Sequence, residues 1–247
     1  ALAAVMAEAA RDATTAGDAP DIMSILRRAK QRVALITGHA DLAGIWDSTT
    51  VMLHLSAFAD LAVQTAVGFL LRQAARAKTI RLPHPRTPEK DSGLAVIALG
   101  KWGAHELNYS SDIDLMVIFD PAKSPVVKKD ETQNFFIRLT RDLARILEEF
   151  TADGYVFRCD LRLRPDPGAM PLAVSIETAE TYYGSLGQNW ERAAMIKARP
   201  VAGDDTVGAD FKKLMDTWIW RRNLDFAAIQ DIHSIKRQIN AKHNRKQ

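Results

Sequence analysis

A proline-rich segment separates a part of the chain with helical hydrophobic periodicity from a part with short apolar runs. Residues 81–93 contain three prolines and a cluster of charged side chains. Proline interrupts a helix because it lacks an amide proton and its ring clashes with the preceding turn, so this segment predicts an exposed connection. We therefore expect a helical part before it and a different architecture after it.

Helical periodicity dominates the part before the connection. Apolar residues recur at three- and four-residue spacings between Asp21 and Ile36, which predicts a helix with one buried stripe. A second helix, rich in Ala and Leu, is predicted from about Thr50 to about Lys78. Its apolar stretch is interrupted by three polar side chains that would be costly in a bilayer, His54, Asp60 and Gln64. The pattern favours a core helix, and we predict no membrane span.

Short apolar runs follow the connection and predict strands at residues 94–99, 115–119, 155–163 and 172–176. One helix is predicted near Glu131 to Ala152, and helical patterns return from Glu177 to the end of the chain. These elements predict an α+β fold, in which a small mixed sheet has helical segments at both ends. The expected divisions are a helical region at 1–87, the sheet region at 88–176 and a second helical region at 177–247.

Composition limits the environment and the partners. The chain has 33 basic and 30 acidic residues, a net charge of only +3, so charge gives no reason to expect nucleic-acid binding. Its single cysteine, Cys159, excludes an internal disulfide and a cysteine-rich zinc site, which fits a reducing compartment. The first residues lack the basic flank and continuous apolar core of a signal peptide. We expect a cytoplasmic protein.

Two carboxylates open the second predicted strand. Asp112 and Asp114 are separated by one residue, and because side chains alternate along a strand, both project to one face. Two neighbouring carboxylates repel each other unless a cation lies between them, and the hard ions Mg²⁺ or Mn²⁺ suit oxygen ligands. The pair therefore predicts a metal site.

A later strand repeats the pattern. Between Arg158 and Arg164, alternation would place Arg158, Asp160, Arg162 and Arg164 on one face. Asp160 could complete a cluster of three carboxylates, and Arg162 and Arg164 could hold phosphate oxygens, for which a guanidinium is well matched. Carboxylates with arginines indicate phosphoryl or nucleotidyl transfer. The alternative for both arginines is a structural ion pair, with Asp112 or Glu191.

A glycine turn precedes the Asp-x-Asp pair. Gly100 and Gly103 would allow backbone N–H groups to approach a phosphate, with Lys101 and the Ser111 hydroxyl nearby. A solvated lysine beside a turn is the competing interpretation of Lys101. For Tyr182, Tyr183 and Trp190, packing in the core is the default, with stacking on adenine as the alternative.

Long segments of the chain resemble a known family, the nucleotidyltransferases with a polymerase-beta-like palm, and within it the bifunctional glutamine synthetase adenylyltransferase/adenylyl-removing enzymes. The resemblance is carried by GKWGAHELNYSSDIDL, by DLRLRP followed by PLAVS, and by NWERAAMIKARPVAGD, with weaker agreement at DLAG and WRRNLDFAAI. It implies that residues 88–176 form the palm and that Asp112, Asp114 and Asp160 are catalytic and hold Mg²⁺ or Mn²⁺. The implied partners are glutamine synthetase, an adenine nucleotide, phosphate and a nitrogen-signalling regulatory protein.

The resemblance also implies a direction of reaction. Tyr182-Tyr183 and the run from Gln188 to Arg192 are similar to the amino-terminal, adenylyl-removing half of that family. The expected reaction is removal of AMP from a tyrosine of glutamine synthetase by phosphorolysis, which gives ADP. Two alternatives stay open: transfer of AMP from ATP in the forward direction, and a non-catalytic regulatory module with the same fold.

Overall fold

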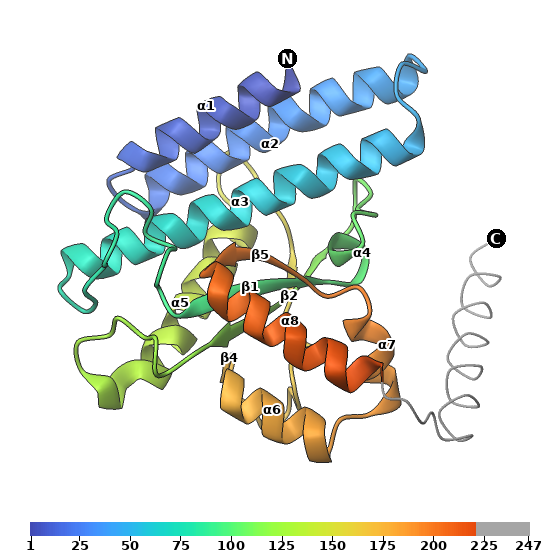
Figure 1. Cartoon of the computed structure of the whole chain (residues 1–247). Helices are drawn as coiled ribbons and strands as arrows, with labels where there is room; N and C mark the ends of the chain where they lie inside the picture. Colours follow the sequence, from blue (N-terminus) through green and yellow to red (C-terminus); the bar gives the residue numbers. More distant parts are fainter. Residues whose placement is uncertain (221–247) are drawn as a thin grey trace.

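The computed structural model describes residues 1–220 of the chain, in which helices surround one small sheet (Figure 1). The predicted helix from Asp225 onward and most of WRRNLDFAAI lie outside the described residues. The helices are α1 (Leu2–Thr15), α2 (Ala19–Leu42), α3 (Ser48–Arg76), α4 (Gly100–Gly103), α5 (Thr132–Glu148), α6 (Ile176–Ser185), α7 (Asn189–Met195) and α8 (Asp205–Ile219), with a 3-10 turn at Lys129–Glu131. The strands are β1 (Leu94–Leu99), β2 (Ile113–Phe119), β3 (Cys159–Asp160), β4 (Ala173–Ser175) and β5 (Arg199–Gly203).

The sheet is mixed, as the sequence predicts for an α+β fold. Its strands lie in the order β3-β2-β1-β5, and β4 also pairs with β2. β1 is antiparallel to β2 and to β5, whereas β2 is parallel to β3 and β4. Every residue of β1 is buried, because this central strand is covered on both faces. The buried central strand therefore holds the neighbouring strand β2 in a fixed position, and β2 in turn pairs with β3.

Helices cover both faces of the sheet and create two apolar cores. Residues of α1, α2, α3 and α5 pack against one face, where β1 and β2 contribute Val96, Ala98, Ile113, Leu115 and Val117. Residues of α6, α7 and α8 pack against the other, where the same strands contribute Ala95, Ile97, Leu99, Met116 and Ile118. The alternation of the two sets along each strand follows from the two-residue period of side chains. In Figure 1, α3 lies on one side of the sheet and α6 and α8 on the other.

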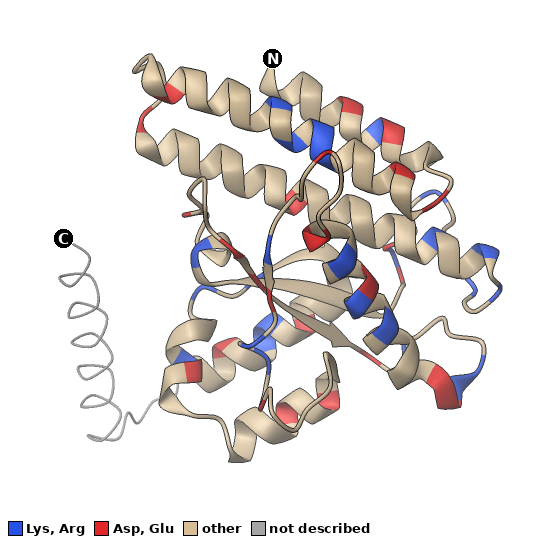
Figure 2. Cartoon of the chain, turned by 180° about the vertical axis from the view of Figure 1, so that it is seen from behind, with Lys and Arg blue, Asp and Glu red and all other residues tan. Residues whose placement is uncertain are grey.

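The long apolar helix α3 is part of the first core. It is the only helix within residues 1–220 that is long and apolar enough to cross a membrane, and more than half of its most apolar window is buried inside the protein. Phe58, Ala62 and Val63 are fully or almost fully buried, which is the pattern of a core helix. Figure 2 shows Lys and Arg interspersed with Asp and Glu over the helices and loops of the opposite view.

The sheet contains one strand that the sequence did not predict. β5 lies in the region from residue 177 onward, where we expected helices only, and it pairs with β1. Pro200 obscures this strand, since proline lacks an amide donor and is confined to edge strands or bulges. Both conditions hold, because β5 is at the edge of the sheet and its register with β1 shifts between Val96 and Ile97. The expectation of a purely helical segment was therefore wrong at Arg199–Gly203.

A second correction concerns the predicted strand at 155–163. Only Cys159 and Asp160 form β3, and the chain turns after Asp160. The Asp160 carboxylate accepts a hydrogen bond from the backbone N–H of Arg162 at 2.8 Å, a side-chain turn that competes with continued strand pairing. The prediction that charged side chains alternate on one strand face up to Arg164 was consequently wrong beyond Asp160.

The segment that leads into β3 is held by α2. Arg27, fully buried, donates to the carbonyl oxygens of Ile146, Glu149 and Gly154. Lys30 donates to the carbonyl oxygen of Tyr155 at 3.1 Å, and its Nζ lies 4.3 Å from the centroid of the Tyr155 ring. These contacts fix the carboxyl end of α5 and the following turn, so a helix far away in sequence determines where β3 begins.

Candidate active site

Strand register brings two of the predicted carboxylates together. Asp114 on β2 lies directly opposite Asp160 on β3, and Ile113 lies opposite Cys159. Neighbouring strands are about 4.8 Å apart, so paired residues of this kind place their carboxylates within reach of one ion. Asp112 immediately precedes β2 on the same side as Asp114. The structure therefore gathers Asp112, Asp114 and Asp160 at the end of β2 and β3.

Electrostatics confirm that the three side chains interact. Burial is the largest cause that raises the pKa of Asp114, and the negative charges of Asp160 and Asp112 raise it further. Arg162 and Lys101 oppose that rise. The pKa of Asp160 is lowered instead, first by the hydrogen bond from the Arg162 side chain. Among residues 1–220, the cluster thus contains a half-buried carboxylate, Asp114, with no ion-pair partner and two carboxylates that have one.

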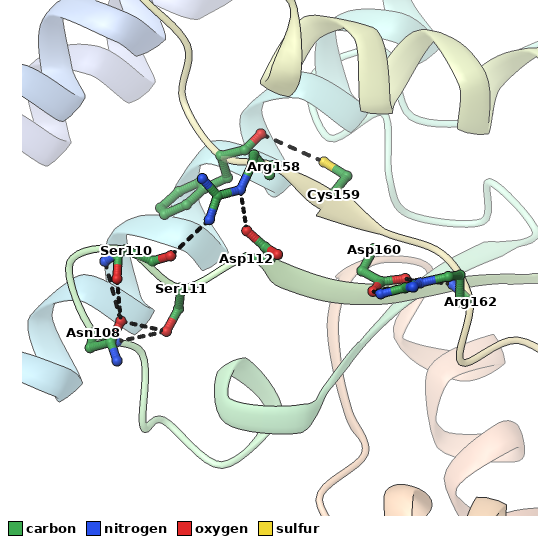
Figure 3. A network of polar contacts seen from close by, with 9 residues as sticks. Asn108, Ser110, Ser111, Asp112, Arg158, Cys159, Asp160 and Arg162 are labelled. Atoms are coloured by element: carbon green, nitrogen blue, oxygen red, sulfur yellow. Dashed lines mark hydrogen bonds and ion pairs between the residues drawn. The ribbon is translucent and has the colours of Figure 1, made fainter. Parts of the chain in front are cut away.

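Arginines bind the two outer carboxylates. Arg158 donates through Nε to Asp112, and its Nη2 donates to the carbonyl oxygen of Ser110 at 3.0 Å. The Nε of Arg162 lies 3.0 Å from each carboxylate oxygen of Asp160, and Nη2 also donates to Oδ2. Figure 3 shows the Arg158–Asp112 pair beside the loop that contains Asn108, Ser110 and Ser111, and Arg162 beside Asp160 on the side of Asp112 away from that loop. The side chain of Arg162 is 83% exposed, so it can move without disturbing the core.

The glycine turn lies against Asp114. Gly100 has a φ of +55°, in the left-handed region that favours glycine, and a Cβ built there would lie 2.2 Å from Oδ2 of Asp114. A Cβ on Gly103 would lie 2.1 Å from the carbonyl oxygen of Lys197. The turn therefore requires both glycines for close approach. Lys101, exposed in the first turn of α4, lies near enough to Asp114 to lower its pKa.

A polar network that the sequence did not reveal holds this turn in place. Arg199 on β5 forms a two-pronged ion pair with Asp60 on α3, at 2.9 Å for each N–O distance. Asp60 also accepts a hydrogen bond from Nε1 of the fully buried Trp102 at 2.8 Å. Lys197 pairs with Glu106 at 2.7 Å. The basic residues after Trp190 thus have structural partners, and the signal that could have identified one of them is Asp60, an acid within an apolar helix.

Ser111 makes its contacts inside the loop that precedes β2. Its hydroxyl donates to Oδ1 of Asn108 at 2.8 Å and accepts from the backbone N–H of Asn108 at 3.2 Å. Ser110 accepts the hydrogen bond from Arg158 through its backbone carbonyl. The loop is therefore shaped by its own polar side chains, and it delivers Asp112 to the start of β2.

Arg164 differs from its predicted position. Its guanidinium donates to the carbonyl oxygens of Leu161, Pro167 and Pro171, at 2.7, 2.9 and 3.1 Å. These bonds close the loop between β3 and β4, and they leave the side chain without a contact to Asp160. The expectation that Arg164 shares the Asp160 face failed because the strand ends at Asp160.

The tyrosine pair belongs to the second core. Tyr182 and Tyr183 are buried, and the hydroxyl of Tyr182 donates to both carboxylate oxygens of Glu191 at 3.0 and 3.1 Å. Glu191 is itself buried and accepts from the backbone N–H of Gln188, which completes a capping box for α7. Trp190 is 44% exposed. The default interpretation as core residues holds for the two tyrosines.

The donor set fits a hard divalent cation. Asp112, Asp114 and Asp160 supply carboxylate oxygens, and the repulsion that raises the pKa of Asp114 would be relieved by a cation among them. Within residues 1–220, no three His, Cys, Asp or Glu side chains already enclose a common point as metal ligands do. Arg158 and Arg162 hold Asp112 and Asp160 instead. The chemistry of the ligands therefore suits Mg²⁺ or Mn²⁺, provided that the two exposed arginines move.

Comparison with known proteins identifies the family. The family model described as glutamate-ammonia ligase adenylyltransferase matches residues 1–214. Similar curated proteins, each named bifunctional glutamine synthetase adenylyltransferase/adenylyl-removing enzyme, include those of Mesorhizobium japonicum (51% identity; 89% of this chain, 22% of the relative), Rhizobium meliloti (52%; 90% and 22%) and Brucella suis (49%; 98% and 25%). The chain spans about a quarter of the length of these relatives. Because the family model covers most of the described residues, the chain belongs to the glutamate-ammonia ligase adenylyltransferase family.

Proposed function

We propose that this chain is a metal-dependent nucleotidyl-transfer unit that removes AMP from an adenylylated tyrosine of glutamine synthetase. The observation that carries the proposal is the juxtaposition of Asp112, Asp114 and Asp160 at the end of two parallel strands. The names of the relatives, adenylyltransferase and adenylyl-removing enzyme, support the substrate. A cytoplasmic location and a nitrogen-signalling regulatory partner belong to the same proposal.

The proposed reaction is phosphorolysis. An oxygen of inorganic phosphate forms a bond to the phosphorus of the AMP group, and the bond from that phosphorus to the tyrosine oxygen breaks. The tyrosine oxygen takes up a proton, and ADP is released. When bound, Mg²⁺ or Mn²⁺ neutralises charge on the transferring group and aligns the entering and leaving oxygens.

The residues of this chain contribute binding and orientation. Asp112, Asp114 and Asp160 would hold the cation, and the close approach of Gly100 to Asp114 fixes the central carboxylate. Lys101 and Arg162 supply positive charge at the cluster, where a phosphate dianion would otherwise be repelled by the carboxylates. Arg164 is left out of this proposal, because three of its N–H groups already donate to loop carbonyl oxygens.

The test is an assay with purified chain, adenylylated glutamine synthetase, inorganic phosphate and Mg²⁺. Phosphate-dependent release of ADP is expected, without a requirement for ATP. Asp114→Asn should lower the rate at least a hundredfold, about 3 kcal/mol of transition-state stabilisation, because it removes charge from the cluster with little change in side-chain volume. Asp153→Asn is the matched control, since Asp153 lies in the turn before β3 and contacts Ser24 on α2.

Product analysis decides the direction. If the chain instead transfers AMP from ATP onto unmodified glutamine synthetase, the same carboxylates perform the forward reaction and phosphorolysis is the wrong assignment. If neither reaction occurs and the chain still binds glutamine synthetase, the regulatory alternative replaces the catalytic one. Near-normal turnover by Asp114→Asn would contradict the role of the carboxylate cluster in either direction.

A further inference from the structure

The two outer carboxylates of the cluster already have cationic partners within the chain. Arg158 binds Asp112, and Arg162 binds Asp160 through its side chain and its backbone N–H. Asp114 pairs with Asp160 across β2 and β3, and no side chain within residues 1–220 forms an ion pair with its carboxylate. A cation that entered the cluster would therefore compete with two guanidinium groups for Asp112 and Asp160 (Figure 3).

A groove beside Arg158 offers its side chain an alternative position. The Arg158 side chain is 58% exposed and lines an open groove of about 650 Å³ beside α5, together with the acids Glu148 and Glu149 and the bases Arg141 and Arg145. A guanidinium that left Asp112 would thus find acidic groups in the same groove.

We propose that Arg158 and Arg162 are displaceable counter-ions that occupy Asp112 and Asp160 in the metal-free chain and set its affinity for the divalent cation. Binding of the cation releases Arg158 toward Glu148 and breaks the ion pair of Arg162 with Asp160, while the exposed Arg162 side chain remains beside the cluster. This inference rests on the proposed metal site, but it concerns binding alone and involves no glutamine synthetase. It assigns the arginines a positioning role, because they act through the carboxylates.

The competition has a predictable sign. Replacing an arginine that pairs with a carboxylate frees that carboxylate to bind the metal ion. The replacement also removes the repulsion between the guanidinium and the metal ion. Exposed ion pairs are weak, so Arg158→Gln or Arg162→Gln should tighten Mn²⁺ binding by up to about fivefold. A residue that merely supported the fold would weaken metal binding when replaced, so the sign separates the two roles.

The experiment measures the dissociation constant for Mn²⁺ on the chain, by calorimetry or by electron paramagnetic resonance of free Mn²⁺. Arg141→Gln is the matched control, because Arg141 lines the same groove and carries the same charge but has no carboxylate of the cluster as a partner. Glu148→Gln should weaken Mn²⁺ binding, since it removes an acceptor for the released Arg158. Asp114→Asn reports whether the ion occupies the cluster.

The results separate this inference from the proposed function. Tighter Mn²⁺ binding in Arg158→Gln than in Arg141→Gln, lost when Asp114→Asn is added, supports the displacement. Unchanged or weaker binding in Arg158→Gln, with wild-type binding that depends on Asp114, overturns the displacement and leaves the metal site intact. Mn²⁺ binding that is absent, or that does not depend on Asp114, overturns both.

Discussion

Replacing Gly100 with alanine tests the geometry of the cluster without removing any of its charges. The added Cβ would lie 2.2 Å from Oδ2 of Asp114, a separation that atoms cannot adopt. The carboxylate must rotate or β2 must shift, and either movement displaces the central ligand of the proposed site. A misplacement of about 1 Å in an active site can lower the reaction rate a hundredfold. We therefore expect at least a hundredfold loss of transfer rate, which corresponds to a rise of about 2.7 kcal/mol in the activation barrier.

The strain of the left-handed backbone must be separated from the contact with Asp114. Alanine at positive φ costs about 1–2 kcal/mol wherever it occurs. Gly44, in the turn between α2 and α3, has a φ of +66° and nothing within 4 Å of a built Cβ. Gly44→Ala is therefore a control that carries the backbone strain alone, and in a chain of this size each kcal/mol lowers Tm by about 2–4 °C.

The assay compares the two variants in thermal unfolding and in phosphate-dependent ADP release. Both should lose a few degrees in Tm, and only Gly100→Ala should lose the activity. Full activity in both variants would refute the reasoning, because it would mean that the close approach of the turn to Asp114 is not needed. Loss of activity in both would attribute the effect to strain in the fold.

Two further predictions concern stability. Burial, the largest cause, raises the pKa of Glu89 to about 7, so the folded chain retains a proton that the unfolded chain releases, and the free energy of unfolding should fall from about pH 4.5 to pH 7. Glu89→Gln should remove this fall and be more stable than wild type by about 3 kcal/mol at pH 8 and by nothing near pH 4, in denaturant titrations at each pH; a difference that does not change with pH would contradict the burial of an ionisable group. Arg27→Met should lower the free energy of unfolding by about 3 kcal/mol, because it leaves several buried carbonyl oxygens without donors, whereas Arg32→Met, which removes only an exposed pair with Glu8, should leave it nearly unchanged. Similar losses in the two arginine variants would show that Arg27 does not fix the turn before β3.

Local patterns predict the elements that are regular over many residues. Leu94–Leu99 was predicted as a strand with the bounds that it has, and the apolar run predicted as a strand at 115–119 lies within β2, which begins at Ile113. The periodic segments near residues 21–36 and 50–78 are α2 and α3, each a few residues different at its ends. These predictions succeeded because burial on one or both faces imposes a period that the sequence displays directly.

The missed elements depend on contacts that are distant in sequence. β5 contains Pro200 and is too short to show a period, and it exists because β1 offers it an edge and Asp60 binds Arg199. β3 ends after two residues because the Asp160 carboxylate turns the chain back through the N–H of Arg162. No count of alternating residues reveals either cause.

The candidate site also has a part that the sequence predicts and a part that depends on distant contacts. The three carboxylates of the proposed site were predicted from sequence, but their arrangement follows from tertiary contacts. Asp114 is placed by β2 and by the glycine turn, whereas Asp160 is placed by a turn that Arg27 and Lys30 hold from α2. The helical part before residue 81 is therefore not an accessory to the sheet. A change in how α2 packs against α5 alters where Asp160 meets Asp114, so the geometry of the carboxylate cluster is coupled to the stability of a helix more than one hundred residues earlier in the chain.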